Sequence, residues 1–328
     1  MSAAIGLLGT GSHLPERAVD NIEVGAPAGV TDEWVTRKTG ISARRWADAG
    51  EATSDLAASA GRAALEDAGV EVAEVSLIVV ATSTPDSPQP PTAALVARTL
   101  GAPNSTAAFD LNAVCSGFVF ALETARHYLA GTGSGLALVI AADVYSRCID
   151  RADRRTAVLL GDGAGAAVLG PVPEGHGILA TRLATFGQHS DLIKVRGGGS
   201  RRPASPATLA KGDQYFRMHG RGVADFVHEN VPPAVAGFLA DNGTDPAEVD
   251  HLVPHQANGN LVHRLSEELA LTNARTHTTV ERFGNTGAAS VPVTLDDAAK
   301  AKEIDPGQLV LLAAFGGGMS SGLCLLRW

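Results

Sequence analysis

Three short segments, far apart in the chain, each place one chemically capable side chain among small residues. The segments are residues 112–117, 253–258 and 284–290. They contain Cys115, His255 and Asn285. A cysteine can attack an acyl group, whereas a histidine and an asparagine can hold, polarise and protonate what is attached. This set of side chains is typical of an enzyme that uses thioesters.

Cys115 is expected at a turn from a strand into a helix. Apolar residues recur at helical spacing from Phe118 to Leu129, so the helix should begin just after Cys115. Unpaired N–H groups and the dipole at a helix N-terminus favour a thiolate. We therefore interpret Cys115 as a nucleophile rather than as a buried structural thiol, the ordinary role of a lone cysteine. Cys148 and Cys324 lack such a setting, and both are interpreted as structural.

His255 follows an apolar run that ends at Pro254, so its side chain should project from the end of a strand. The alternative is a structural histidine with satisfied hydrogen bonds. A metal site is not expected, because Pro254 breaks any helical face that would join His251 to His255.

Several glycine-flanked stretches allow two interpretations. Asn285 lies in an Asn-Thr-Gly sequence that is also good turn chemistry, so a donor role and a turn role both remain open. Residues 315–318, Phe-Gly-Gly-Gly, either offer a backbone N–H to a thioester oxygen or form only a tight turn. Residues 6–11 and 161–168 are glycine-rich, but neither has the setting of a dinucleotide-binding βαβ unit.

The composition argues against several classes of protein. At 328 residues the chain is long for one simple core, so two lobes are expected. Its net charge of −9 argues against nucleic-acid binding, which relies on clustered Lys and Arg. No run approaches the roughly 18 apolar residues of a membrane helix, and no basic stretch opens the chain as in a secretory leader. With only three cysteines, a soluble cytoplasmic protein with reduced thiols is expected.

The order of the expected elements repeats in the second half of the chain. Buried strands are expected at residues 76–81, 136–142, 250–254 and 309–314. Helices are expected at residues 57–68, where Gly69 would end the helix, and at residues 291–300. A series of matched elements in the same order favours an internal duplication over coincidence.

The two halves align with one offset in residue number. Leu122 with Leu295, and Leu138 with Leu311, give the same difference (295−122 and 311−138). This offset places Cys115 on Ala288 and His255 on Thr82, so the reactive loops should lie at equivalent element ends. Proline and glycine punctuate residues 171–177, which we interpret as the join between halves 1–172 and 173–328.

Taken together, these segments resemble a β-ketoacyl-acyl-carrier-protein synthase III, a thiolase-fold condensing enzyme, over essentially the whole chain. Each piece is short, but their order and spacing are specific. The matching pieces are Gly9-Thr10-Gly11-Ser12, Asp32-Glu33-Trp34, Thr39-Gly40-Ile41, the Cys115 segment, residues 161–167, residues 254–258, Gly284-Asn285-Thr286 and residues 315–318. The resemblance implies an α/β fold, a duplicated five-layer αβαβα arrangement with mixed sheets, and a homodimer.

The resemblance also implies a two-step mechanism. Cys115 takes an acyl group from an acyl-CoA or carrier thioester, and the N–H groups of Cys115 and Gly317 form the oxyanion hole. His255 and Asn285 then bind the carbonyl of a malonyl thioester, so that loss of CO2 leaves a stabilised enolate that attacks the acyl-cysteine. No metal and no bound cofactor are implied, since CoA or phosphopantetheine thioesters are substrates.

Five residues correspond to the family's CoA-binding region. They are Trp34, Lys38, Arg154, Arg221 and Asn258. Trp34 and Arg154 resemble an adenine-stacking pair, which is reasonable because an indole and a guanidinium can face opposite sides of a purine. Lys38 stands where the family commonly has Arg, and Arg221 replaces an expected Asn.

The expected carrier-docking face also departs from the family pattern. Asn260 replaces a basic residue, and Glu267 and Glu268 replace lysines. Because an acyl carrier protein is acidic, this face favours a CoA substrate or a dedicated carrier over a generic one. Two enzymatic interpretations remain open: a specialised condensing enzyme of fatty-acid or polyketide biosynthesis, and an acyltransferase that moves the acyl group from Cys115 without condensation.

Overall fold

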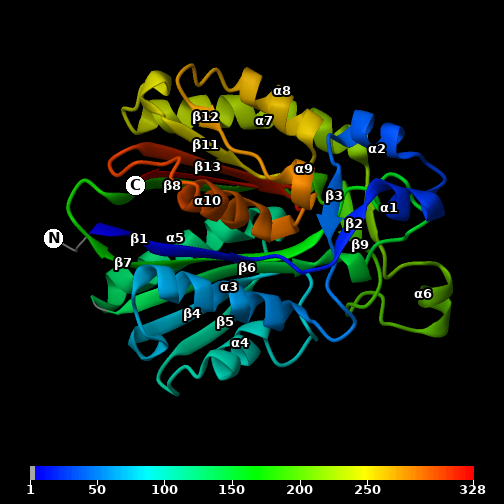
Figure 1. Cartoon of the computed structure of the whole chain (residues 1–328), viewed down its shortest axis with the longest axis horizontal. Helices are drawn as coiled ribbons and strands as arrows, with labels where there is room; N and C mark the ends of the chain where they lie inside the picture. Colours follow the sequence, from blue (N-terminus) through cyan, green and yellow to red (C-terminus); the bar gives the residue numbers. More distant parts are fainter. Residues whose placement is uncertain (1–3, 134) are drawn as a thin grey trace.

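The chain folds into two five-stranded sheets that stack face to face with helices between and outside them (Figure 1). The computed structural model describes residues 4–133 and 135–328. The first sheet contains β1 (Ala4–His13), β4 (Val75–Ala81), β5 (Ala107–Leu111), β6 (Leu136–Val144) and β7 (Asp162–Val172). The second contains β8 (Gly177–Thr185), β11 (His251–Pro254), β12 (Arg275–Thr276), β13 (Leu309–Gly316) and β14 (Ser320–Arg327).

The two sheets have the same topology. Their strand orders are β1-β7-β6-β4-β5 and β8-β14-β13-β11-β12. In each sheet the three strands at one side are parallel, and the other two join antiparallel. The offset found in the sequence carries the first residue of β1 onto that of β8, and the first residue of β6 onto that of β13. The expected duplication and mixed sheets are therefore confirmed.

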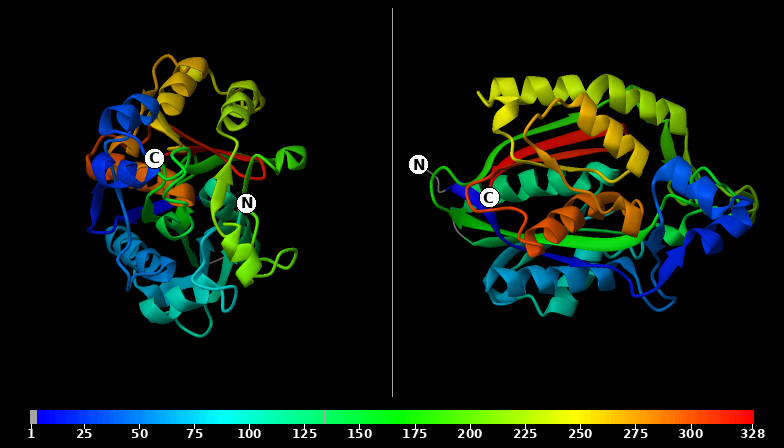
Figure 2. Two further views of the ribbon diagram at one scale, coloured as in Figure 1. Left: turned by 90° about the vertical axis from the view of Figure 1, so that its right-hand side faces the viewer. Right: turned by 45° about the horizontal axis from the view of Figure 1, so that its top comes forward.

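Helices form the other three layers. Between the sheets lie α5 (Gly117–Thr132) and α10 (Ser290–Lys300). One outer face carries α3 (Thr53–Ala68) and α4 (Thr92–Leu100), and the opposite face carries α7 (Gly220–Asp241) and α8 (Gly259–Glu268) (Figures 1 and 2). The largest apolar cluster is formed by α5, α10 and the inner faces of both sheets. This is the expected αβαβα arrangement.

Small residues allow the close packing of these layers. Ala57, Ala60 and Ala64 of α3 are completely buried against the first sheet. Opposite them, a Cβ at Gly9 or Gly11 of β1 would collide with the α3 backbone. The helix therefore approaches the sheet at backbone distance, and this explains why the chain is rich in Gly and Ala but poor in aromatic residues.

The remaining short elements gather mainly at the end of the molecule away from the termini (Figure 1). They are β2 (Ala18–Asp20), α1 (Asn21–Ala28), α2 (Asp32–Thr39), β3 (Ala43–Arg45), β9 (Ile193–Val195), α6 (Pro206–Ala210), β10 (Phe216–Met218) and α9 (Val280–Phe283). Single turns of 3₁₀ helix are η1 (Val72–Glu74), η2 (Val114–Ser116), η3 (Tyr145–Arg147), η4 (Gly187–His189), η5 (Pro246–Glu248) and η6 (Gly287–Ala289).

The predicted strands and helices are all present, with small shifts at their ends. The first predicted helix begins at Thr53, earlier than expected, because the Asp55 carboxylate accepts the Ala52 N–H at 2.9 Å and stabilises an earlier first turn. The proposed division of the chain at residue 172 falls between β7 and β8. Within residues 4–133 and 135–328, no helix is long and apolar enough to span a membrane.

Candidate active site

A strained turn presents Cys115 at the N-terminus of α5. The turn follows β5, and Val114 has φ 48°, a left-handed conformation that is costly for a β-branched residue. The Asn112 Oδ1 accepts the Val114 N–H at 3.1 Å and supports this conformation. Cys115 itself is only 7% exposed. Its expected place at a strand-to-helix turn is confirmed.

The resting Cys115 group is a thiol. Burial is the main effect that raises its pKa, and the negative charge of Asp143 raises it further, while a backbone N–H opposes them. Burial therefore opposes the thiolate that the N-terminus of α5 was expected to favour. Proton loss has to accompany attack on the acyl donor, since the thiol is a weak nucleophile.

Gly316 packs directly against the backbone of Cys115, which occupies the space that a side chain at position 316 would need. A Cβ at Gly316 would lie 2.7 Å from the Cys115 nitrogen and 3.0 Å from its Cβ. Both are closer than normal contacts, so a side chain at this position would displace the nucleophile. Gly317 follows in the turn to β14, where a Cβ would touch Val114 and Ile193 at 3.4 Å. The glycines at 316–318 therefore bring the β13–β14 turn against the cysteine turn.

His255 lies immediately after β11 and is 2% exposed. Its Nδ1 lies 2.7 Å from the Ser290 Oγ, at the start of α10, and its backbone N–H donates to the Ala313 carbonyl at 2.8 Å. In the described part of the chain, no hydrogen bond engages His255 Nε2. Burial lowers the pKa of His255 to about 3, so the imidazole is neutral at physiological pH.

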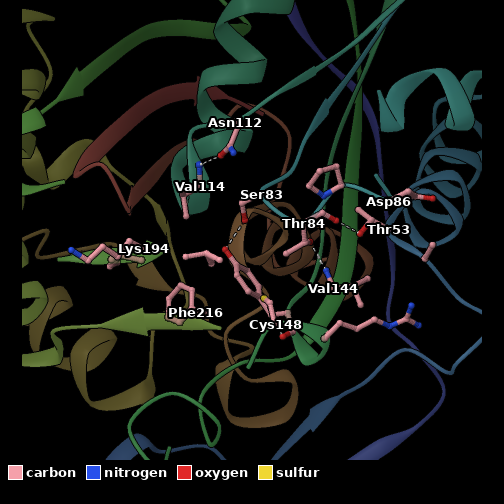
Figure 3. Close-up of a pocket in the computed structure, with 16 residues that line it drawn as sticks. Thr53, Ser83, Thr84, Asp86, Asn112, Val114, Val144, Cys148, Lys194 and Phe216 are labelled. Atoms are coloured by element: carbon pink, nitrogen blue, oxygen red, sulfur yellow. Dashed lines mark hydrogen bonds between the residues drawn. The ribbon is translucent and has the colours of Figure 1, made fainter. Parts of the chain in front are cut away.

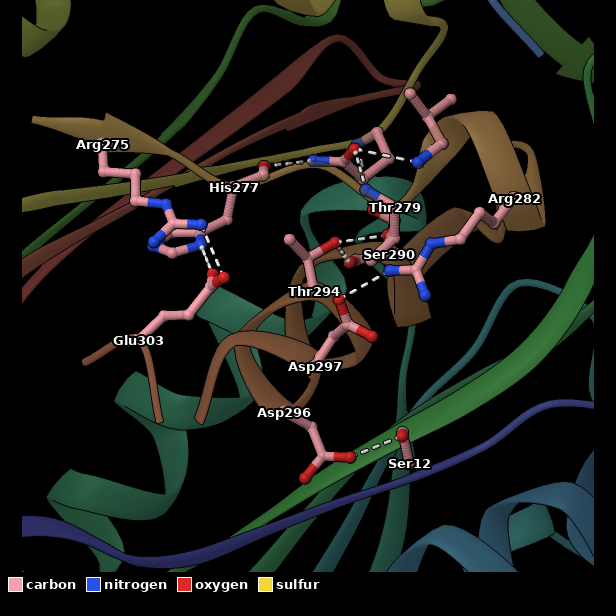
Figure 4. Close-up of polar contacts among 12 residues, drawn as sticks. Ser12, Arg275, His277, Thr279, Arg282, Ser290, Thr294, Asp296, Asp297 and Glu303 are labelled. Atoms are coloured by element: carbon pink, nitrogen blue, oxygen red, sulfur yellow. Dashed lines mark hydrogen bonds and ion pairs between the residues drawn. The ribbon is translucent and has the colours of Figure 1, made fainter. Parts of the chain in front are cut away.

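The Gln256 side chain fixes the turn after His255. It is completely buried, and its Nε2 donates to the Pro254 carbonyl at 2.7 Å, while its Oε1 accepts the Thr279 N–H at 3.1 Å. Thr279 also shares a hydrogen bond of 2.6 Å with Thr294 of α10 (Figure 4). These contacts tie the turn after β11 to α10, so that Ser290 and the imidazole keep a fixed relation.

The oxygen and the NH2 group of the Asn285 side chain have different roles. Its side-chain Oδ1 accepts the Gly287 N–H at 2.9 Å, the turn contact that the sequence suggested. The amide Nδ2 therefore points away from this N–H, and within the described residues no hydrogen bond engages it. The backbone of Asn285 is held by Leu159 and Gly161, at 2.8 and 2.9 Å. The turn thus places Asn285 at the wall of a cavity of about 280 Å³.

The three segments meet where the two halves of the chain face one another. The η2 turn of Cys115 packs against η6, which directly follows Asn285 and Thr286, and also against β13 and β14. The folded chain therefore brings together loops from opposite halves of the sequence. Sequence reasoning missed two neighbours: Ser290, the partner of the imidazole, and Asp143, a completely buried carboxylate close to Cys115.

A cavity of about 520 Å³ lies beside Asn112 and Val114, in the turn that carries Cys115 (Figure 3). Asn112 and Val114 of the nucleophile turn line it, and so do Tyr145, Cys148 and Phe216. Cys148, which the sequence analysis interpreted as structural, thus lines this cavity, and burial raises its pKa to about 12.

Two smaller cavities lead from Asn285 towards α2. The first is the 280 Å³ cavity, which Asn258, Asn260 and Arg264 of the α8 region also line. The second, of about 240 Å³, is lined by Trp34, Arg37 and Arg154. The Arg154 guanidinium carbon lies 5.7 Å from the centre of the Trp34 ring, and Asn260 donates to the Arg37 carbonyl at 3.1 Å. The hydrogen bond between Asn260 and Arg37 therefore joins a residue that lines the first cavity to one that lines the second.

The predicted CoA-binding residues divide into two groups. Trp34, Arg154 and Asn258 line these cavities, although Asn258 also caps α8 by accepting the Leu261 N–H at 2.9 Å. Lys38 and Arg221 are exposed and, in the part of the chain that the structure describes, line neither cavity; their assignment stays a prediction. Arg37, which sequence reasoning passed over, lines the Trp34 cavity instead.

Comparison with known sequences gives matches over nearly the whole chain. A family model described as 3-Oxoacyl-[acyl-carrier-protein (ACP)] synthase III matches residues 109–187, and one described as its C terminal matches residues 239–328. The chain is 56% identical over 324 residues to Acetoacetyl CoA synthase NphT7 of Streptomyces sp. (strain CL190), covering 98% of both proteins. It is 41% identical over 325 residues to a β-ketoacyl-[acyl-carrier-protein] synthase III of Caldanaerobacter subterraneus, covering 99% of this chain and 98% of the relative.

Solved structures agree with these sequence matches. The crystal structure of 3-oxoacyl-(acyl carrier protein) synthase III from Pseudomonas aeruginosa PAO1 is 34% identical and superposes with a TM-score of 0.90, covering 99% of this chain and 98% of the other. The duplicated fold, the meeting of the cysteine, histidine and asparagine loops, and these similarities lead to one assignment. The chain belongs to the β-ketoacyl-[acyl-carrier-protein] synthase III family of acyl-transferring condensing enzymes.

Proposed function

We propose that this enzyme loads a short acyl group from CoA onto Cys115 and condenses it with malonyl-CoA, releasing CO2. The observation that supports this most directly is the orientation of Asn285, whose Oδ1 is occupied by Gly287 while its NH2 group is left for a ligand. Together with a neutral His255, it supplies uncharged donors of the kind that stabilise an enolate oxygen.

In the first half-reaction the Cys115 sulfur attacks the thioester carbonyl of the acyl-CoA. The new bond joins this sulfur to the acyl carbon, the bond from that carbon to the CoA sulfur breaks, and the thiol proton leaves with CoA. Negative charge collects on the carbonyl oxygen in between, and the N–H groups of Cys115 and Gly317 are the proposed donors for it. The acyl chain then occupies the 520 Å³ cavity.

In the second half-reaction the malonyl thioester lies along the cavities from Trp34 to Asn285. The Ser290 hydroxyl accepts the Gln256 N–H at 3.3 Å, so its own proton can point to His255 Nδ1 and leave the imidazole proton on Nε2. Nε2–H and the Asn285 NH2 then donate to the thioester oxygen. The bond to the carboxylate breaks, CO2 leaves, and the enolate carbon attacks the acyl-cysteine, releasing the Cys115 thiolate, which is reprotonated.

The surface beside this path favours CoA over an acidic carrier protein. Arg264 and His228 both line the 280 Å³ cavity, and Glu268 contacts both side chains, at 2.9 Å and 2.6 Å. The expected acidic face is therefore an ion-paired one, with Glu267 still exposed. The similarity to an acetoacetyl CoA synthase supports acetyl and malonyl groups on CoA as the substrates. A dedicated carrier protein is the alternative partner.

We further infer a homodimer in the cytoplasm. Strand β5 lies at an open edge of its sheet, and Phe109 in the middle of it is 38% exposed, so that a second copy could continue the sheet. All three cysteines are unpaired, which suits a reducing compartment. Native mass spectrometry tests the dimer: a monomer at micromolar concentration would contradict it.

Intact-mass spectrometry followed by a chase tests the reaction itself. Incubation with acetyl-CoA should add one acetyl group at Cys115, and subsequent malonyl-CoA should remove it with release of one CO2 and formation of acetoacetyl-CoA. Acetylation without CO2 release would instead assign the enzyme to simple acyl transfer, and no acetylation of Cys115 would reject both schemes.

A further inference from the structure

The internal duplication creates a second set of positions that matches the active site. The offset between the halves relates Cys115 to Ala288, Asn285 to Asn112, His255 to Thr82 and Gly316 to Asp143 (288−115, 285−112, 255−82 and 316−143). We call Thr82, Asn112, Asp143 and Ala288 the second centre. Each residue of the second centre lies in the other half of the chain from the active-site residue that it matches.

The second centre has the same local geometry as the active site. Val114 and Gly287 are related by the offset, and both are left-handed, with φ 48° and 63°. Their N–H groups donate to Asn112 and Asn285, at 3.1 Å and 2.9 Å. The helices α5 and α10 begin at equivalent residues. The backbone N–H groups of Cys115 and Ala288 are therefore presented in the same way.

The difference lies in what faces these two N–H groups. At the second centre, Asp143 Oδ2 accepts the Ala288 N–H at 2.8 Å. At the active site the counterpart of Asp143 is Gly316, which has no side chain and leaves the Cys115 N–H to a substrate oxygen. The Asp143 carboxylate thus occupies the place that the substrate oxygen takes at the active site.

The surroundings of Asp143 are those of a bound anion. Its Oδ1 accepts the Ser83 N–H at 2.9 Å and hydroxyl groups of Thr82, Ser83 and Thr84 at 3.0 to 3.2 Å. Burial raises the pKa of Asp143 above its usual value, and the N–H groups of Ala288 and Ser83 and the hydroxyl groups of Ser83 and Thr84 only partly oppose this rise. Each carboxylate oxygen receives a backbone N–H, which cannot accept a proton, so the arrangement suits the ionised form.

We propose that Asp143 is a positioning residue that acts as a permanent internal anion, filling the oxyanion place of the second centre and thereby holding the turn that carries Asn285. Ala288, whose N–H it binds, follows Asn285 closely in the same turn, and Gly287 between them packs directly against the carboxylate. The proposal rests on the proposed function, because it assigns the effect of Asp143 to the malonyl half-reaction in which Asn285 donates.

The test compares two substitutions and an added anion. Asp143→Asn keeps the size of the side chain but turns an NH2 group towards N–H donors, and Asp143→Gly copies the state of Gly316 and leaves an anion-sized space. In both variants, CO2 release from malonyl-CoA should fall roughly 10- to 100-fold, and acetylation of Cys115 should fall much less. Sodium formate should restore CO2 release to Asp143→Gly in a saturable way, entering from the 520 Å³ cavity that Ser83 and Thr84 line.

A matched control is Asp162→Gly. Asp162 is also completely buried in the first half and accepts backbone N–H groups from Ala47 and Ser146, at 2.8 Å each, but does not contact Ala288. Its loss should lower both half-reactions together, without rescue by formate. The proposal is overturned if the Asp143 variants keep the parent ratio of the two half-reactions, if formate restores nothing, or if neither variant folds even in formate. Decarboxylation by the parent enzyme, measured first, tests the proposed function separately.

Discussion

The imidazole of His255 stands edge-on to the ring of Phe315, with 5.2 Å between the ring centroids. Phe315 is followed by Gly316, against which the backbone of Cys115 lies. The end of β13 therefore sets the separation of the imidazole from the nucleophile. The same apolar wall keeps water from His255, and this burial is what lowers the pKa of its side chain to about 3.

This low pKa predicts a flat pH profile for the malonyl half-reaction. A histidine with the usual pKa near 6.5 would become charged as the pH falls through that value, whereas His255 stays neutral until about pH 3. CO2 release by the acetylated enzyme should therefore show no inflection between about pH 5.5 and 7.5. Stopped-flow measurement across this range checks it; a step centred near pH 6.5 would contradict a buried neutral imidazole.

Cys115→Ser should abolish acyl loading while the fold persists. An alcohol is far harder to deprotonate than a thiol, and the donors around it are otherwise unchanged. Intact-mass spectrometry with acetyl-CoA and far-UV circular dichroism measure the two properties. Acetylation that persists in this variant, or that maps to Cys148 in the parent, would overturn the assignment of the nucleophile.

His255→Ala and Asn285→Ala should separate the two half-reactions. Each variant should still acetylate Cys115, more slowly, but should lose about 2.7 kcal/mol or more of transition-state stabilisation in decarboxylation, since each removes one enolate donor. Release of labelled CO2 from malonyl-CoA measures the loss. If both variants released CO2 at the parent rate, simple acyl transfer would become the better description.

Gly316→Ala should impair both half-reactions. The new methyl group would lie 2.7 Å from the Cys115 nitrogen, so the nucleophile and its N–H group must shift. Gly131→Ala in α5 is the control, because a Cβ there meets open space. Acetylation kinetics and thermal denaturation of both variants are compared. Parent-like acetylation by Gly316→Ala would show that the cysteine turn tolerates displacement.

Charge reversal on α8 should improve the use of a generic acyl carrier protein. Glu267→Lys with Glu268→Lys would free Arg264 and add positive charge beside the thioester path. The on-rate for malonyl carrier protein should rise at low salt and return to the parent value when salt is added, because exposed charges are screened beyond about 10 Å at 0.1 M.

The control for this charge reversal has the same change in net charge. Glu66→Lys with Glu71→Lys alters exposed residues at the end of α3 and just after it, on the opposite outer face (Figure 1). It should leave the on-rate unchanged. A parent enzyme that low concentrations of the generic carrier already saturate would refute the proposed preference for CoA.

Much of the fold could be predicted because the pattern repeats. Each buried strand is a continuous apolar run, and two matched leucine pairs were enough to find the offset that relates the sheets. Cys115, His255 and Asn285 were found because each stands alone among small residues at an element end. Family resemblance then supplied roles that the spacing of the segments does not contain.

Other residues of the site could not be found in this way. Asp143 ends an apolar strand, and its partners are residues 82–84 and Ala288, which only the folded chain brings together. Ser290 directly precedes the helix expected at residues 291–300, and only the folded chain places it beside His255. Lys38 was chosen by family position and stays a prediction; its neighbour Arg37, whose side chain lies about 100° away around the helix, lines the Trp34 cavity.

The 520 Å³ cavity and the 280 Å³ cavity share none of the residues that line them in the described chain. If the CoA parts of both proposed substrates bind along the cavities from Trp34 to Asn285, they have to use that passage in turn. An excess of acetyl-CoA would fill that passage in the acetylated enzyme and compete with malonyl-CoA. The product keeps the CoA of the malonyl substrate and has to leave the same way, so the relative supply of the two thioesters sets the rate of turnover.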